Sequence, residues 1–162
     1  MCGRFTVTAT PHELLSRFGV AINSNLAPRW NVAPSQKSPI ITANGITRDM
    51  VMAQFGLDGI IAQKTLINAR SETIAEKPTF RQAFQTSRCL VVASGWYEWQ
   101  AKNKPYHIQL NDGRVMAFAG LHYQVGNHAR FVIVTSAATG KLADIHHPVS
   151  YTHLTLPTTP YV

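Results

Sequence analysis

The sequence has no long hydrophobic run and little cysteine. None of its uncharged apolar stretches approaches the roughly 18 residues that a membrane-spanning helix requires. The N-terminus also lacks the basic-then-apolar layout of a secretion signal, so we expect a cytoplasmic protein with no membrane partner. Its two cysteines, Cys2 and Cys89, stand in very different surroundings, and this pattern does not imply a disulfide framework.

Acidic residues are also scarce. There are 8 Asp and Glu against 15 Lys and Arg, which gives a formal charge of +7, and the pI is near 9.8. This excess is in the range expected of a nucleic-acid binder, although solubility alone would also account for it.

Signatures of cofactor binding are absent as well. The sequence contains no phosphate-cradling glycine loop and no internal repeat. The histidines at 12, 107, 122, 128 and 153 show no metal-ligand spacing with the two cysteines. We therefore expect neither a metal nor another cofactor.

A length of 162 residues with 45% apolar content suits one hydrophobic core. The last segment differs from the rest, because residues 148–162 are rich in Thr, Pro and Leu and carry no Asp, Glu, Lys or Arg. We expect one domain over residues 1–147 and a foreign tail over residues 148–162.

Two short helices are predicted. Thr10 and Glu13 form a capping-box pattern with Pro11 in the first turn, and Gly19 suits the C-terminal end. The apolar stripe of this helix is expected to comprise Leu14, Leu15 and Phe18. A second helix is expected to begin near Pro78, with Phe80, Ala83 and Phe84 at helical spacing.

Most of the remaining pattern indicates strands. Runs rich in β-branched and aromatic residues occupy residues 39–42, 49–55, 89–93, 115–119 and 131–135. Asn111-Asp112-Gly113 predicts a hairpin turn between strands at 106–110 and 115–119. Residues 27–35, which contain Pro28 and Pro34, are expected to form an ordered loop at the site. The predicted class is α+β with mostly antiparallel pairing.

Cys2 offers distinctive chemistry if Met1 is removed, because a terminal cysteine carries an amine and a thiol side by side. An α-amine with a pKa of about 7.7–8.0 is roughly a tenth to a fifth neutral at pH 7, so it can attack an aldehyde. The thiol can then close a five-membered thiazolidine ring. By position alone, Cys2 could equally be just a small residue after the start codon.

Five motifs in a fixed order favour the functional interpretation: Met1-Cys2-Gly3-Arg4-Phe5, Arg29-Trp30-Asn31-Val32-Ala33-Pro34, Ile67-Asn68-Ala69-Arg70-Ser71-Glu72-Thr73, Gly95-Trp96-Tyr97-Glu98-Trp99 and Asp144-Ile145-His146-His147. Together they make residues 1–147 resemble the SRAP family, named for SOS-response-associated peptidase. The resemblance implies a β-rich fold with a DNA-binding cleft, and a covalent crosslink to abasic sites in single-stranded DNA.

The resemblance also implies catalytic roles. Cys2 would be the nucleophile, and Asn68 would hold the opened sugar by hydrogen bonds. Glu98 lies between Trp96 and Trp99, and a carboxyl group in apolar surroundings is suited to move protons, although it could also be a surface residue after a strand. His146 would help to open the sugar ring and to reverse the crosslink.

Further residues match DNA-contacting positions of the family. Arg4 and Arg70 would bind phosphates through forked hydrogen bonds. Trp30 and Asn31 would line the cleft, with the indole ring stacking on a base, and Thr135 would lie near the lesion. Structural roles are the alternatives: ion pairing for the arginines, core packing for Trp30 and a strand end for Thr135.

The sequence departs from the family at two places. Pro148 follows His147 directly, where the family has a short motif with an arginine and then several tens of residues, so we expect a fold that lacks its C-terminal part. At Phe55, before Gly56, the family usually has tryptophan, and Phe55 would stack or wedge with less area.

Other functions remain open at this point. Glutamine amidotransferases also begin with Cys-Gly and use the free amine as a base, but they rely on an Asn-Gly-Asp element that this sequence lacks. A peptidase or autopeptidase using Cys2, or a non-catalytic DNA binder, would also fit. Our prediction is a monomer that shields abasic sites, with possible autopeptidase or lyase activity, and that is nucleoid-associated when bound to DNA.

Overall fold

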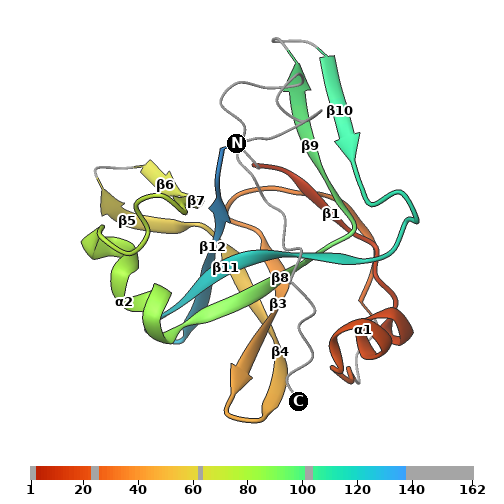
Figure 1. Ribbon diagram of the computed structural model, residues 1–162, viewed down its shortest axis with the longest axis horizontal. Coiled ribbons are helices and arrows are strands. Elements are labelled where there is room, and N and C mark those ends of the chain that lie inside the picture. Colours follow the sequence, from red (N-terminus) through yellow and green to blue (C-terminus); the bar gives the residue numbers. More distant parts are fainter. Residues whose placement is uncertain (1–2, 23–25, 62–63, 101–103, 138–162) are drawn as a thin grey trace.

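Strands dominate the fold. The computed structural model describes residues 3–22, 26–61, 64–100 and 104–137, and within these ranges two helices accompany twelve strands (Figure 1). Most strand pairs are antiparallel. The predicted α+β, β-rich class is therefore confirmed.

The larger sheet has the order β11-β8-β3-β4-β12-β7, and a further pairing of β11 with β12 closes its first five strands into a barrel. These strands are β3 (Lys37–Asn44), β4 (Thr47–Phe55), β7 (Asn68–Arg70), β8 (Arg88–Ala93), β11 (Met116–Val125) and β12 (His128–Thr135). Closure removes the unpaired edges that an open sheet of this size would present to solvent.

Aromatic rings fill the barrel. Phe55 stacks on Phe131 with 5.1 Å between ring centroids, and Phe5 meets Phe55 edge-on at 5.5 Å. Phe5 also meets Phe118 edge-on at 5.9 Å. All four side chains are fully buried. Offset and edge-on ring pairs add to the stabilisation from burial, so these rings anchor the main core.

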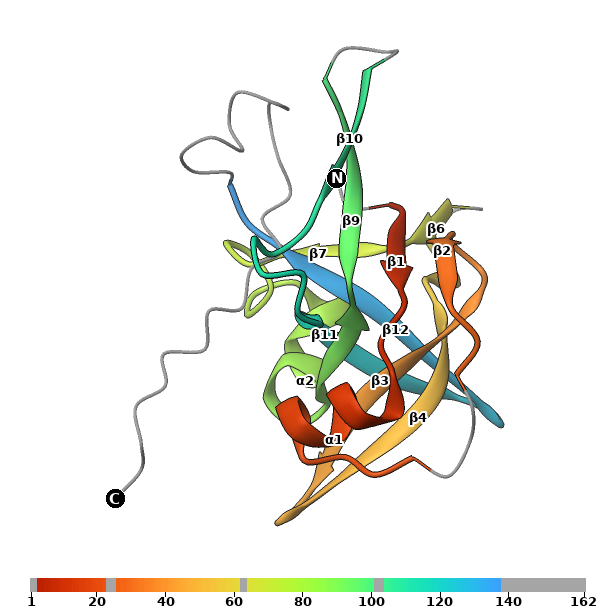
Figure 2. The same cartoon turned by 90° about the vertical axis from the view of Figure 1, so that its right-hand side faces the viewer.

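The smaller sheet has the order β10-β9-β1-β2 with antiparallel pairing throughout. It consists of β1 (Phe5–Val7), β2 (Arg29–Val32), β9 (Gly95–Gln100) and β10 (Lys104–Ile108). The β9–β10 hairpin extends beyond the barrel at the upper end of Figures 1 and 2. Because Phe5 of β1 inserts into the barrel core, the two sheets share one hydrophobic interior.

A separate hairpin leaves the barrel between β4 and β7. It consists of β5 (Leu57–Ile61) and β6 (Lys64–Leu66). Along β12, Arg130 and Phe131 pair with β4, and the pairing passes to β7 at Ile133. The hairpin is thus an excursion of the chain between two strands that share the same edge of β12.

Helix α1 (Pro11–Phe18) begins as the sequence predicts. Thr10 accepts a hydrogen bond from the backbone of Glu13, whose carboxylate accepts from the backbone of Thr10, and Gly19 ends the helix with φ 67°. Leu14 and Phe18 are buried as expected, but Leu15 is 52% exposed, so its predicted burial is wrong. At helical spacing Leu15 lies beside Leu14 on the flank of a narrow stripe.

Helix α2 (Pro78–Thr86) covers a second, smaller core. Phe80 and Ala83 are buried there against Leu57, Leu121 and Val132. Phe84 is partly exposed. No helix in the described ranges is long and apolar enough to cross a membrane.

The predicted hairpin around Asn111-Asp112-Gly113 is wrong. The turn exists, since Gly113 has φ 67° and its amide donates to Leu110 at 2.9 Å. However, β10 pairs with β9, whereas β11 pairs with β8 and β12. The turn therefore passes the chain from one sheet to the other, because both edges of β11 are already occupied.

The predicted loop at residues 27–35 is also partly wrong, because residues 29–32 form β2. Pro28 and Pro34 lie outside this strand, so neither removes a donor from it. The turn that follows includes Ser35 with φ 70°.

Loss of the cap should destabilise α1. Thr10→Ala removes the side chain that bonds the Glu13 amide, and we expect the free energy of unfolding to fall by about 1 kcal/mol in urea titrations. Thr10→Ser keeps the acceptor and serves as the matched control. Equal losses for both variants would show that the hydroxyl does not stabilise the helix.

The same cap should make stability depend on pH. Hydrogen bonds from the backbone and then the hydroxyl of Thr10 lower the pKa of Glu13 from 4.5. The charged carboxylate therefore stabilises the fold above that pH, and this contribution is lost as the pH falls below it. Glu13→Gln should be less stable than the parent at about pH 7 and approach it at about pH 3, and a constant difference would refute the linkage.

Candidate functional site

The start of β1 lies at the centre of the candidate site. Phe5 pairs with Trp96 of β9 on one side and with Val32 of β2 on the other. The amide of Tyr97 donates to the carbonyl of Arg4 at 2.9 Å, so the ladder continues beyond β1 towards the N-terminus. Gly3, the first described residue, follows Cys2 in the chain, and Cys2 itself lies outside the described residues.

Glu98 is a buried acid in β9. Successive side chains of a strand point to opposite faces, and Trp96 and Glu98 both lie on the buried face at 3% and 2% exposure. Tyr97 is half-buried, and Trp99 is exposed on the other face. Burial of a carboxyl group costs free energy. A carboxyl group buried on the strand beside the chain start is suited to exchange protons there.

Arg4 and Asn31 meet between the start of β1 and β2. Nη1 of Arg4 donates to Oδ1 of Asn31 at 3.1 Å, and both residues are exposed. The Trp30 side chain is 66% exposed, so core packing does not explain it. Arg4 and Asn31 therefore form an exposed polar pair beside the start of β1, and Trp30, the neighbour of Asn31 in β2, presents its exposed ring on the other face of that strand.

Asn68, Arg70 and Thr135 form a second group on neighbouring strands. Asn68 of β7 aligns with Ile133 and Arg70 with Thr135 of β12. Asn68 is half-buried and Arg70 is exposed. Thr135 is buried, and its hydroxyl donates to the carbonyl of Ala69 at 3.4 Å, which connects it to the backbone of β7.

Glu72, two residues after Arg70, bonds the segment that follows β12. Its carboxylate accepts from the amide of Ala137 at 3.2 Å. Backbone hydrogen bonds, from its own amide first and then from that of Ala137, lower the pKa of Glu72. The carboxylate therefore connects the segment after β7 to the segment after β12.

Both groups lie at one end of the molecule. Strands β1, β7 and β9 occupy the upper part of Figure 1, and the turned view in Figure 2 shows them at the same height together with β2. Within the predicted set, the fold brings Arg4 and Asn31 into direct contact. His146, like Cys2, lies outside the described residues.

Tyr97 has no role predicted from the sequence, yet it connects β9 to β2. Its hydroxyl donates to the carbonyl of Trp30 at 3.0 Å and so reaches across β1 to β2. Its ring lies 5.0 Å from the ring of His107 and 6.4 Å from that of Trp99. Its place beside Glu98 in the Gly95–Trp99 motif could have drawn attention to Tyr97. Its contact with Trp30 could not be predicted, because it depends on the order of strands β9, β1 and β2.

Gly95 allows this aromatic cluster to close. A Cβ atom there would lie 2.6 Å from Nε2 of His107 and 2.7 Å from the carbonyl of Ile108. Nε2 of His107 in turn lies 3.3 Å from the hydroxyl of Thr6. Only glycine lets β10 approach β9 so closely.

Phe55 is not available to DNA. It is fully buried between Phe5 and Phe131, so the expectation that it stacks on or wedges between DNA bases is wrong. Its ring fills the barrel instead, because β4 directs it inward. Within the described ranges, no group of three His, Cys, Asp or Glu is arranged to hold a metal ion.

Comparisons with known proteins agree with this arrangement. Residues 1–152 match the family model described as SOS response associated peptidase (SRAP). Abasic site processing protein YoaM of Bacillus subtilis is 34% identical, with 94% of this chain and 76% of the relative covered. Abasic site processing protein YedK of Escherichia coli is 31% identical, with 90% and 72% covered.

Solved structures have the same fold. A phage-related protein of Bordetella bronchiseptica gives a TM-score of 0.71 at 25% identity, covering 93% of this chain and 78% of the other. A protein of Bacteroides thetaiotaomicron gives 0.73 at 25% identity, covering 89% and 72%. The motifs, the fold and the family match agree, and the chain belongs to the SOS response associated peptidase (SRAP) family.

Proposed function

We propose that this chain processes abasic sites in single-stranded DNA by linking Cys2 covalently to the opened sugar. Relatives that cover most of the chain are named abasic site processing proteins. The observation that carries the proposal is the setting of the β1 start. It pairs with β9, which holds the buried acid Glu98, and its Arg4 contacts Asn31 of β2.

The chemistry requires removal of Met1. The freed amine of Cys2 attacks the aldehyde carbon of the ring-opened abasic sugar, and loss of water gives an imine. The thiol sulfur then adds to the imine carbon while its proton passes to the nitrogen. The product is a thiazolidine ring, and the only by-product is water.

Glu98 and Asn68 would serve this reaction in different ways. The Glu98 carboxyl, buried on the inner face of β9, would move protons between the amine, the departing water and the sugar oxygen. Asn68 would hold the opened sugar by hydrogen bonds. His146 would assist ring opening and reversal, a role that rests on the family resemblance.

Exposed cations and one exposed ring would hold the DNA strand. Arg4 and Arg70 are both exposed, and their guanidinium groups are suited to two phosphates. Trp30, which is largely exposed, offers a face for stacking that does not depend on base identity. Thr135 would act indirectly by holding the backbone of β7.

Replacement of Cys2 should abolish the adduct. Cys2→Ala removes the sulfur, so we expect no crosslink to abasic single-stranded DNA that survives denaturing electrophoresis, while non-covalent binding remains. Cys89→Ala is the matched control, because Cys89 is buried and burial raises the pKa of its thiol to about 12. An undiminished adduct in Cys2→Ala would refute the proposal.

Removal of Arg4 or Arg70 should flatten the salt dependence of binding. For each lost phosphate contact on single-stranded DNA, the slope of log K against log salt should decrease in magnitude by about 0.7. We expect this for Arg4→Ala and Arg70→Ala. Arg114→Ala is the control, because Arg114 pairs with Asp112 at a turn far from β7 in sequence. Unchanged slopes would mean that neither arginine contacts phosphate.

A further inference from the structure

The β5–β6 hairpin ends directly before Asn68. Leu66 ends β6 and only Ile67 separates it from β7, so the hairpin leads directly into Asn68. The amide of Ile133 donates to the carbonyl of Ile67 at 3.0 Å, which fixes one side of the hairpin base to β12. On the other side, the amide of Gly56 donates to the carbonyl of Phe131 at 2.8 Å.

Gly56 lets the two arms of the hairpin meet closely at the base. Its φ of 104° lies in the region that favours glycine. A Cβ atom there would also lie 2.5 Å from Cγ2 of Thr65. Close approach of this kind places Thr65 against the point where β4 ends.

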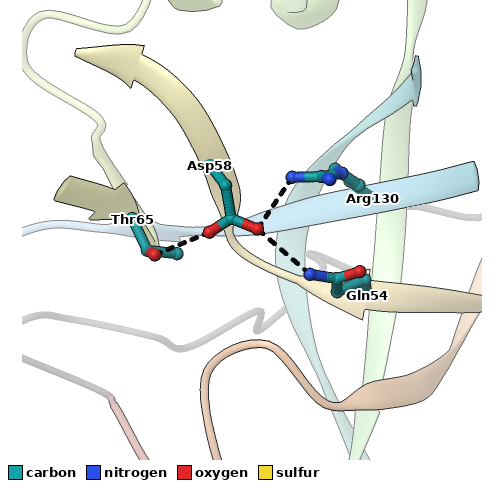
Figure 3. Close-up of polar contacts among 4 residues, drawn as sticks. All are labelled: Gln54, Asp58, Thr65 and Arg130. Carbon is teal, nitrogen blue, oxygen red and sulfur yellow. Dashed lines mark hydrogen bonds and ion pairs between the residues drawn. The ribbon is translucent and has the colours of Figure 1, made fainter. Parts of the chain in front are cut away.

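One carboxylate connects the hairpin to two barrel strands (Figure 3). Oδ1 of Asp58 accepts from the hydroxyl of Thr65 at 2.6 Å, across the hairpin. Oδ2 accepts from Nη1 of Arg130 on β12 at 2.9 Å and from Nε2 of Gln54 on β4 at 3.2 Å. Both oxygens of Asp58 are therefore used, one within the hairpin and one towards the barrel.

Arg130 depends on this carboxylate. Its side chain is only 19% exposed, and its Nε atom is buried without a hydrogen-bond partner among the residues described. Asp58 supplies the charge that compensates this guanidinium. A partly buried ion pair with bonds to both oxygens is less screened by solvent than an exposed pair.

We propose that Asp58 is a positioning residue whose contacts with Thr65, Gln54 and Arg130 fix the β5–β6 hairpin and thereby the location of Asn68. This inference rests on the proposed function, because Asn68 matters there as the group that holds the opened sugar. Asp58 itself does not touch the reacting atoms. It acts through the geometry of the chain that leads into β7.

The test separates the rate of reaction from DNA binding. Asp58→Asn should lower the maximal rate of adduct formation at saturating abasic DNA by about tenfold, because misplacement of a positioning group slows the chemical step. The DNA concentration at half-maximal rate should change less than the maximal rate, since Arg4, which precedes β1 of the other sheet, keeps its place. Thr65→Val, which removes only the bond across the hairpin, should show a smaller loss in the same direction.

Asp112→Asn is the matched control. Like Asp58, which is 41% exposed and pairs with Arg130 at 2.9 Å, Asp112 is 45% exposed and pairs with an arginine, Arg114, at 2.6 Å. The control should leave both the rate and the half-saturating concentration unchanged. Arg130→Lys, which keeps the charge, should retain more of the rate than Arg130→Met.

Hydrogen exchange tests, in the absence of DNA, whether Asp58 fixes the β5–β6 hairpin and β7. Amides of β6 and β7 should exchange faster in Asp58→Asn than in the parent, with the rest of the barrel unchanged. Parental rate and parental exchange in Asp58→Asn would overturn the proposal, as would an equal loss in Asp112→Asn. If the parent protein forms no adduct, the proposed function fails, and the exchange measurement still decides whether Asp58 fixes the hairpin.

Discussion

Backbone hydrogen bonding along β12 is the constraint on which the rest of the structure depends. One edge of this strand pairs with β11 and closes the barrel, and the other edge pairs first with β4 and then with β7. Because one strand carries both pairings, the position of Asn68 is coupled to the closure of the hydrophobic core. The aromatic stack of Phe55 on Phe131 lies where β4 and β12 meet and stabilises the same junction.

The candidate site combines residues of two sheets that differ in how many neighbours their strands have. Arg4, Trp30, Asn31 and Glu98 lie on the small antiparallel sheet, whereas Asn68 and Arg70 lie on a short strand at the barrel edge. The small sheet inserts Phe5 of β1 into the main core and holds the buried acid Glu98 on β9, the strand next to β1. The edge strand β7 has only β12 as a sheet neighbour in the described chain, so side-chain contacts around the preceding hairpin carry more weight there.

Local patterns in the sequence were sufficient for the two helices and for six of the twelve described strands. The capping box of Thr10 and Glu13, the glycine at position 19 and the proline at position 78 act within a few residues, so α1 and α2 could be predicted. Strand pairing was harder. The Asn111-Asp112-Gly113 turn forms as predicted, but a turn motif does not determine which strands pair when other strands compete for the same edges. The five ordered motifs were sufficient to indicate the family.

Sequence by itself determined the chemistry on offer and the residue types: a cysteine after Met1, a glutamate among aromatic residues, and arginines beside an asparagine. Only the tertiary structure decided that Phe55 belongs to the core, that Tyr97 bonds the strand of Trp30 and that Asp58 meets Arg130. The physical reason is the separation of the contacting residues along the sequence. Helix caps and turns are set by neighbouring residues, whereas these contacts join strands that become neighbours only when the barrel closes.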